Sequence, residues 1–362
     1  MKILYVAFKY DYADKKRGHS YEHFNFWDTL LAIYGKDIIY FPMDEKTMEL
    51  GRSGMNKALL DLVEKEKPDI LFTSLFTNEI KPKTIKKITK DSNTITINWF
   101  SDDQWRFDNF SRYWAPLYDW VVTTDEKALP KYKKIRYDRV IKSTWAANPN
   151  IYKPVNSSHE YGVTFVGSAN GIRKKNVEEL RKLGIKVDCW GSGWEGGRAS
   201  QEKMTEIFTN SKINLNFAQV STSARDFKTL LKAFAKIFLR RGTNDTYHFF
   251  PSSIILRNLF RFSLPKVGPQ IKGRNFEVPA CGGFILTQDA ENLSDYYVFG
   301  EEIVVFDTID EAAEKIRYYL RSGEERKAIA KAGYNRTTAE HTWEKRFEDI
   351  FRTVQKHGKR KS

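Results

Sequence analysis

The chain has 362 residues, which suits two α/β domains of about 150–200 residues each better than a single domain. Hydrophobic residues make up 41% of it and no low-complexity tract occurs, so the sequence is not that of a largely disordered protein. The net charge of +14 predicts an anionic partner, such as nucleotide phosphate, anionic lipid or nucleic acid.

Two features of the sequence indicate the cellular compartment of the protein. No apolar run approaches the roughly 18–20 residues needed to cross a bilayer, and the N-terminal MKILYVAF has no cleavage site after it. Cys189 and Cys281 lie far apart, without disulfide or zinc spacing, which is typical of a reducing compartment. We therefore expect a cytoplasmic protein, either soluble or peripheral at the inner face of the membrane.

Strand-like and helix-like segments alternate through the first half of the chain. Strands are expected at 1–8, 37–42, 69–75, 94–100, 120–124 and about 140–147, with helices at 20–34, 55–66 and 82–90. Strands separated by helices predict a parallel sheet that is covered on both faces. This half is the predicted N-terminal domain, residues 1–150.

A second series follows the stretch NPNIYKPVNSSHE (148–160), whose Pro, Asn and Ser residues are typical of an interdomain linker. Strands are expected at 161–168, 187–190, 213–218, 283–287 and 303–307, with helices at 176–183, 201–209, 274–281 and 309–321. Residues 160–342 form the predicted C-terminal domain, and residues 343–356 complete the first domain. The predicted fold class is α/β, with two Rossmann-like domains facing across a cleft and a C-terminal helix crossing back.

The segment GRNFEVPACGGFILTQDAENLSDYYVFGEEIVVFD (273–307) resembles the donor-binding half of GT-B glycosyltransferases. It is most similar to the group-1 transferase domain of spore-coat-maturation-type proteins, and the similarity extends over roughly 273–351. Weaker similarity lies at FVGSANGIRKKN, at CWGSGW and at the linker. The resemblance implies that a nucleotide diphosphate sugar binds in the C-terminal domain and donates its sugar.

The donor-binding residues follow from this resemblance. Glu277, in the E-x-x-A-C-G context, is expected to accept hydrogen bonds from the ribose hydroxyls. Gly273 and Arg274 lie where a helix N-terminus and a cation would meet a diphosphate. Related transferases carry a second Glu eight residues earlier, but this sequence has Pro269 there, so that contact to the donor sugar does not carry over.

A second phosphate-binding element is expected at residues 167–175, which follow a strand and open a helix. Its candidate residues are Gly167, Ser168, Arg173 and Lys174, which would neutralise the leaving diphosphate without an obligatory metal or other cofactor. The alternative is a basic helix start that faces water. Trp190 ends the next strand and is a candidate for stacking on the base, or equally a core tryptophan beside a tight turn.

Candidate catalytic residues lie in the N-terminal half. Gly18, His19 and Ser20 end the loop after the first strand, which lies beneath the reacting centre in GT-B enzymes, and His19 is a candidate base. Asp102 and Asp103 follow a strand within WFSDDQW, and only one of them is expected to face the cleft. The sequence does not decide between inversion and retention at the transferred carbon.

A basic insertion occupies about 221–272, with ten Lys/Arg against two Asp. Residues 225–241 predict an amphipathic helix whose basic residues, Lys228, Lys232, Lys236 and Arg240, repeat every four positions. Such a helix can lie on an anionic membrane surface, close to a lipid-linked acceptor. The alternative is a helix packed on its own domain with a solvated lysine edge.

The sequence therefore predicts a metal-independent glycosyltransferase that uses a nucleotide sugar donor and a glycan, lipid-linked or protein acceptor. Its nearest rival is a non-catalytic sugar-nucleotide-binding protein of the same fold. A metallopeptidase is weighed because residues 19–23 spell H-x-x-E-H, but no third ligand is evident. A nucleic-acid-binding protein is disfavoured because no recognised motif accompanies the basic segment.

Overall fold

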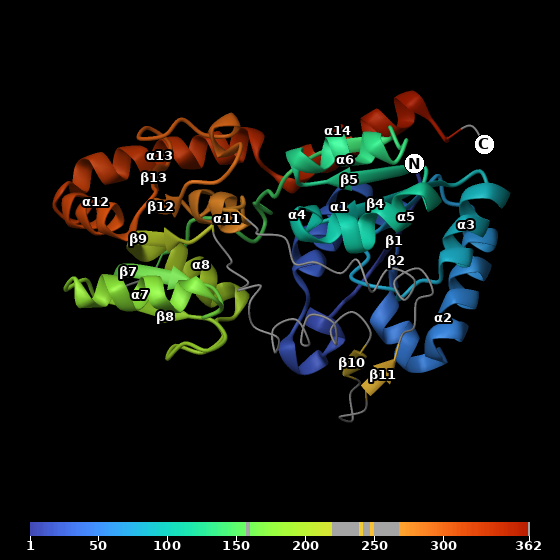
Figure 1. The fold of residues 1–362 in the computed structure, drawn as a ribbon, viewed down its shortest axis with the longest axis horizontal. Helices are drawn as coiled ribbons and strands as arrows, with labels where there is room; N and C mark the ends of the chain where they lie inside the picture. The colour runs from blue at the N-terminus through green and yellow to red at the C-terminus, as the bar shows by residue number, and fades with distance from the viewer. Residues whose placement is uncertain (157–159, 219–238, 242–246, 250–267, 361–362) are drawn as a thin grey trace. The chain divides into compact units, whose positions relative to one another are not determined.

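The structure, a computed structural model, describes residues 1–156, 160–218, 239–241, 247–249 and 268–360 (Figure 1). The chain forms two compact units. Unit 1 contains Met1–Thr144 and Arg346–Ser362, and unit 2 contains Trp145–Ser223 and Lys266–Lys345. The described strands of the insertion, within Ala224–Pro265, group with unit 1, whereas the insertion is expected in the second domain from the sequence.

Unit 1 is built on a six-stranded sheet with the order β2-β1-β3-β4-β5-β6, in which every pairing is parallel. The strands are β1 (Ile3–Ala7), β2 (Ile38–Pro42), β3 (Ile70–Thr73), β4 (Ile95–Phe100), β5 (Trp120–Thr123) and β6 (Val140–Lys142). The helices are α1 (Asp28–Tyr34), α2 (Met43–Glu66), α3 (Pro82–Asp91), α4 (Asp103–Arg106), α5 (Arg112–Trp114) and α6 (Leu129–Lys134). All five residues of β1 are buried, as expected for a central strand covered on both faces.

The last helix, α14 (Trp343–His357), packs on unit 1 from Arg346 onward. The rings of Phe347 and Phe351 lie 5.7 and 5.8 Å from the ring of Phe72 on β3. Beyond the helix, the carbonyl of Gly358 accepts a hydrogen bond of 3.0 Å from Trp120 Nε1. The apolar residues along one face of this helix thus pack against the sheet of unit 1.

Unit 2 is built on a five-stranded parallel sheet with the order β13-β12-β9-β7-β8. The strands are β7 (Tyr161–Val166), β8 (Val187–Trp190), β9 (Ser211–Asn216), β12 (Ile285–Gln288) and β13 (Val304–Phe306). The helices are α7 (Ile172–Lys182), α8 (Gln201–Asn210), α11 (Arg274–Ala280), α12 (Ile309–Arg321) and α13 (Gly323–Glu340). Because neighbouring strands are parallel, the carboxyl ends of β7, β9 and β12 meet at one edge, where ligands bind in sheets of this type.

The predicted helix over 225–241 is wrong at its C-terminal end. Leu239–Arg241 form strand β10, which pairs antiparallel with β11 (Tyr247–Phe249), so Arg240 lies in a strand. The sequence directly after Arg241 is Gly-Thr-Asn-Asp, a composition that opposes a helix and favours a hairpin. Lys228, Lys232 and Lys236 lie outside the described residues.

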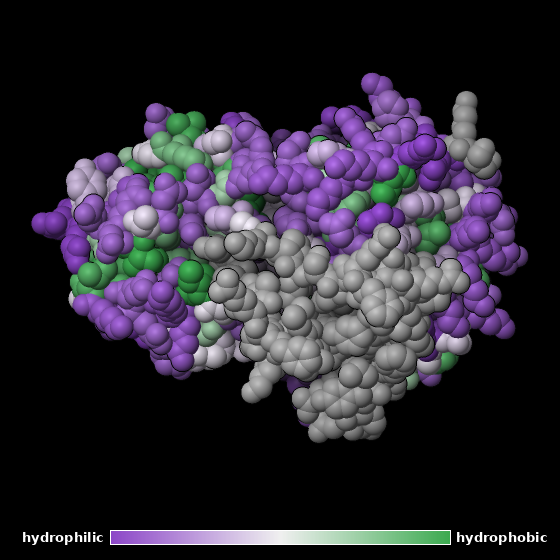
Figure 2. Space-filling model, in the orientation of Figure 1, coloured by the Kyte–Doolittle hydropathy of each residue, from purple (hydrophilic) through white to green (hydrophobic). Residues whose placement is uncertain are grey.

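The described part of the face in Figure 2 is mostly hydrophilic, with smaller hydrophobic areas between charged residues. Within the described ranges, no helix has the length and apolar character needed to pass through a lipid bilayer.

Candidate donor-binding site

Arg274, the first residue of α11, lies at the carboxyl edge of the sheet in unit 2. Its Nε donates to the carbonyl of Val166, the last residue of β7, at 3.3 Å, and its Nη2 lies 3.2 Å from Met204 Sδ. Its guanidinium carbon lies 5.2 Å from the centre of the Phe208 ring. Strand β7 and helix α8, which carries Met204 and Phe208, therefore hold this guanidinium from two sides.

Glu277, one turn further along α11, forms an ion pair with Nη1 of Arg274 through its Oε2. The Glu277 side chain is fully buried, whereas 26% of the Arg274 side chain is exposed. Within the described part of the chain, Glu277 Oε1 is buried and has no hydrogen-bond partner. An unsatisfied buried acceptor costs about 1–3 kcal/mol, and a hydrogen bond donated to this oxygen by a ligand would remove that cost.

Arg173, in the first turn of α7, lies beside these residues. Its Nη2 donates to the carbonyl of Phe217, just beyond β9, at 3.3 Å, and its Nε is buried without a partner among the described residues. Burial, together with the neighbouring charge of Arg274, lowers the pKa of Arg173 to about 10. Arg173 still carries a full charge at neutral pH.

The cluster of Arg173, Arg274 and Glu277 therefore holds two cations and one carboxylate. Repulsion between the two guanidinium groups is only partly relieved by Glu277, and an anion placed between them would relieve the rest. Charge-assisted hydrogen bonds from guanidinium groups are the usual means by which proteins hold phosphates. The electrostatics of the cluster favour a bound diphosphate.

The loops after β7 and β8 touch through glycines. Gly167 N donates to the carbonyl of Trp190 at 2.8 Å, and a Cβ on Gly191 would lie 2.1 Å from Gly167 O. A Cβ on Gly167 itself would lie 2.9 Å from the Phe165 ring and 3.6 Å from Arg173 Nη1. Gly191 is therefore needed for the packing of two loops, which brings Gly167 against Arg173.

The other donor-site candidates lie around this cluster. Gly273 caps α11, and its carbonyl accepts from the backbone N–H of Glu277 at 2.9 Å. Ser168 Oγ accepts from the side chain of Asn170 at 3.0 Å, and Lys174 is exposed. The half-buried Trp190 packs edge-on against Tyr161 with ring centres 5.4 Å apart.

In unit 1, the adjacent carboxylates Asp102 and Asp103 diverge. Asp103 is fully buried, where its Oδ2 accepts hydrogen bonds from Thr123 Oγ1 at 2.6 Å and from the Tyr132 hydroxyl at 2.7 Å. Burial raises the pKa of Asp103 to about 6. Asp102 precedes α4 and is partly exposed. Asp103 thus has a structural position within unit 1, and Asp102 is the accessible member of the pair.

The loop after β1 closes on itself through a bridge between Tyr10 and His19. His19 is exposed, and its ring centre lies 4.1 Å from that of His23. Ser20 is buried, donates to the carbonyl of Phe8 at 2.7 Å and accepts from His23 N at 3.0 Å, so its hydroxyl caps the following helix. Gly18 adopts a φ of +80° in this exposed turn.

Glu22, which belongs to the H-x-x-E-H pattern, is not among the candidate bases expected from the sequence. Burial, with a smaller contribution from the nearby charges of Asp11 and Asp102, raises the pKa of Glu22 to about 7. A carboxyl with a pKa near 7 suits general-base catalysis. The sequence feature that could have pointed to Glu22 is its position one helical turn beyond His19. The resemblance to GT-B enzymes already makes His19 a candidate base.

Metal binding by the H-x-x-E-H residues requires a third ligand. Among the residues that the structure describes, no group of three His, Cys, Asp or Glu side chains is arranged to hold a metal ion.

Comparison with known proteins identifies the fold. Residues 239–352 match the family model described as glycosyl transferase-like. No match was found among curated proteins.

Solved structures resemble almost the whole chain. HepE from Anabaena, in complex with UDP, aligns with a TM-score of 0.58 at 10% identity, over 98% of this chain and 100% of that one. Sucrose-phosphate synthase from Thermosynechococcus elongatus aligns with a TM-score of 0.58 at 11% identity, over 99% and 100%. The lipopolysaccharide outer core galactosyltransferase WaaB aligns with a TM-score of 0.54 at 12% identity, over 98% and 100%. With its two parallel-sheet units, this chain has the GT-B glycosyltransferase fold.

Proposed function

We propose that this chain is a glycosyltransferase that transfers a sugar from a nucleotide diphosphate sugar held by Glu277, Arg274 and Arg173. The observation that carries the proposal is the cluster of two partly buried guanidinium groups and one buried carboxylate at the carboxyl edge of the unit 2 sheet. The complexes of HepE with UDP, with UDP and glucose, and with UDP-glucose support a nucleotide sugar as the donor class. The acceptor is a glycan, a lipid-linked molecule or a protein.

Each residue of the cluster has a separate role in the proposed reaction. The unpartnered Oε1 of Glu277 accepts a hydrogen bond from a ribose hydroxyl, which positions the nucleoside. Arg274 and Arg173 hold the diphosphate. When the sugar–phosphate bond breaks, new negative charge develops on the nucleotide, and these fixed cations stabilise it without requiring a metal ion.

In this proposal, a residue of unit 1 accepts the proton of the acceptor hydroxyl. Asp102 and His19 are accessible candidates, and Glu22 joins them because its pKa is close to neutral. An enzyme that retains the configuration of the sugar needs none of the three as a base.

Calorimetric titration with UDP, GDP, ADP and TDP tests the donor site. For the preferred nucleotide, Glu277→Gln and Arg274→Gln are each expected to weaken binding by about tenfold or more, because each removes a charge-assisted contact. Lys182→Gln, at the far end of α7, is the control and leaves affinity unchanged. Equal affinity in all four proteins would remove the donor assignment.

The rival function, a non-catalytic binder of sugar nucleotides, predicts the same affinities. Slow hydrolysis of the preferred nucleotide sugar separates the two. An enzyme releases free nucleotide at a rate that falls in Arg274→Gln at saturating donor, because Arg274 stabilises the charge that develops on the nucleotide, whereas a binder releases none above the uncatalysed rate.

A further inference from the structure

A second candidate site lies at the opposite edge of the unit 2 sheet. A cavity of about 360 Å³ opens where β7 and β9 begin, where α8 ends and where the first turns of α13 pass. Strand β7 runs six residues from this edge to Val166, the contact of Arg274, which is about 16 Å of extended chain. The cavity is therefore separate from the proposed donor site.

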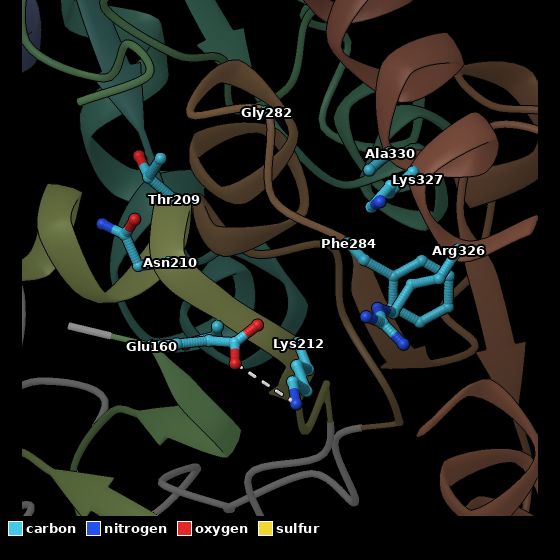
Figure 3. Close-up of a pocket in the computed structure, with 10 residues that line it drawn as sticks. Glu160, Thr209, Asn210, Lys212, Gly282, Phe284, Arg326, Lys327 and Ala330 are labelled. Carbon is cyan, nitrogen blue, oxygen red and sulfur yellow. Dashed lines mark ion pairs between the residues drawn. The ribbon is translucent and has the colours of Figure 1, made fainter. Parts of the chain in front are cut away.

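Three cations line this cavity, against one carboxylate. Lys212 comes from β9, and Arg326 and Lys327 come from α13. Figure 3 shows Thr209 and Asn210 on one side, Arg326 and Lys327 on the other, and the Glu160–Lys212 ion pair below them. This arrangement gives the cavity a net positive charge.

The ion pairs of these cations are open to solvent. Lys212 Nζ lies 3.2 Å from Glu160 Oε2, and 67% of the Glu160 side chain is exposed. Lys327 pairs with Glu324 at 2.9 Å, where both side chains are largely exposed. Water screens such pairs strongly, so both lysines can turn to a bound anion at little cost.

Arg326 is held more firmly. Its Nη1 donates to the carbonyl of Tyr319, near the end of α12, at 2.5 Å. This bond anchors one end of the guanidinium group, and its other N–H groups form no hydrogen bond with the described part of the chain. A fixed, planar fork of donors is the geometry that binds phosphate oxygens in pairs.

The opposite wall offers groups that recognise hydroxyls. The Asn210 amide donates through Nδ2 to the carbonyl of Glu206 at 2.9 Å, while its carbonyl oxygen accepts nothing from the described part of the chain. The Thr209 hydroxyl oxygen accepts from Val155 N at 3.3 Å, so its hydrogen is available to donate. A ligand with a phosphate at one end and hydroxyls at the other would satisfy both walls.

We propose that this cavity binds a monosaccharide phosphate, with the phosphate between Lys212, Arg326 and Lys327 and the sugar hydroxyls toward Thr209 and Asn210. The volume lies near the lower limit of small-molecule sites, about 300–1,000 Å³, which suits one sugar ring with its phosphate and is too small for a nucleotide sugar. The phosphate monoester is mostly a dianion at neutral pH and matches the excess positive charge.

Isothermal titration of the full chain with glucose 1-phosphate and glucose 6-phosphate tests the proposal, with glucose and inorganic phosphate as comparison ligands. At least one sugar phosphate is expected to bind about tenfold more tightly than either comparison ligand. The variants Arg326→Gln, Lys327→Gln and Lys212→Gln are each expected to weaken it by about threefold to tenfold. Lys331→Gln, an exposed lysine on the same helix, is the control and leaves affinity unchanged.

A saturating amount of the nucleoside diphosphate that the chain prefers separates this site from the donor site. If the cavity is the site, sugar phosphate affinity is the same with and without the nucleotide. Three results would each overturn the proposal: competition by the nucleotide, binding that none of the three variants changes, and equal affinity for inorganic phosphate. The absence of any binding at sugar phosphate concentrations of about 10 mM would also overturn it. Because Lys327 and Lys212 hold no buried contact, their variants keep the test valid even if Arg326→Gln unfolds.

Discussion

At the scale of single residues, Arg173 carries a charge that has no carboxylate partner among the described residues, and it lies beside a second cation. In the free protein this charge is a cost, because its pKa is lowered to about 10 by burial and by Arg274. In a complex with a diphosphate the same charge becomes favourable. Residues arranged in this way destabilise the free protein and favour ligand binding.

Arg173→Met is therefore expected to leave the melting temperature of the free protein unchanged or slightly higher, while nucleotide affinity falls by about tenfold or more. Thermal unfolding and calorimetry of the same samples measure the two effects. Arg181→Met, on the same helix, is the matched control, because Arg181 pairs with Glu195 and donates to the Val187 carbonyl, away from the cluster. A lower melting temperature with unchanged affinity in Arg173→Met would give Arg173 a structural role only.

Glu22 gives a prediction about pH. Its pKa is about 7 in the folded chain and 4.5 without the fold, so the folded state binds more protons between these values and the charged form destabilises it. The contribution of Glu22 to stability is fully present below pH 4.5 and is lost as the pH rises through 7. Glu22→Gln, which cannot ionise, is expected to be more stable than the natural chain at pH 8 by about 1–3 kcal/mol. The difference in the free energy of unfolding between Glu22→Gln and the natural chain should become smaller as the pH falls toward 4.5.

Chemical denaturation at pH 5 and pH 8 measures this difference. Glu64→Gln, an exposed glutamate on α2, is the control and shows no such pH dependence. If Glu22 is also the base, the turnover of the natural chain rises with pH to a plateau above 7, and Glu22→Gln abolishes it. A stability gap that is the same at both pH values would contradict the burial of this carboxyl.

At the scale of elements, the two loops at the carboxyl edge of the unit 2 sheet depend on a glycine contact. Gly191 has a φ of +130°, and a methyl group on it would lie 2.1 Å from Gly167 O. Gly191→Ala is therefore expected to lower the free energy of unfolding by about 2–4 kcal/mol and to weaken nucleotide binding, because Gly167 must move away from Arg173. Denaturant unfolding and calorimetry measure both.

Gly197→Ala is the matched control in the same segment. Gly197 also has a positive φ, +62°, but nothing lies within 4 Å of its added Cβ, so only backbone strain of about 1–2 kcal/mol is expected. Equal destabilisation by the two substitutions, with full nucleotide affinity, would mean that the loop contact does not position Arg173.

The elements themselves follow closely from sequence periodicity. Alternation of apolar strands with helices indicates both parallel sheets, because buried parallel strands are continuous apolar runs such as Ile3–Ala7. The secondary structure at the end of the basic segment could not be predicted from periodicity. Periodicity alone continues a helix through Arg240, whereas the chain there pairs as a strand. Helical spacing in a charged segment competes with turn-forming residues just beyond it, and the turn residues decide.

At the scale of the whole molecule, the sequence brings Arg173, Arg274 and Glu277 together only by resemblance, because they come from α7 and α11, about 100 residues apart. The unpartnered oxygen of Glu277 could not be predicted, since it depends on which oxygen Arg274 takes. Nor could the burial of Asp103 and the capping role of Ser20, which are set by Thr123, Tyr132 and Phe8 from other elements. Residue type suggests chemistry, and packing decides which groups are free to perform it.

A structure of the chain with its preferred nucleoside diphosphate tests the central claim most directly. The diphosphate is predicted to contact Arg173 and Arg274 beside Gly167, with a ribose hydroxyl donating to Glu277 Oε1. Nucleotide bound elsewhere, with Glu277 Oε1 still unpartnered and both guanidinium groups without phosphate, would contradict the account.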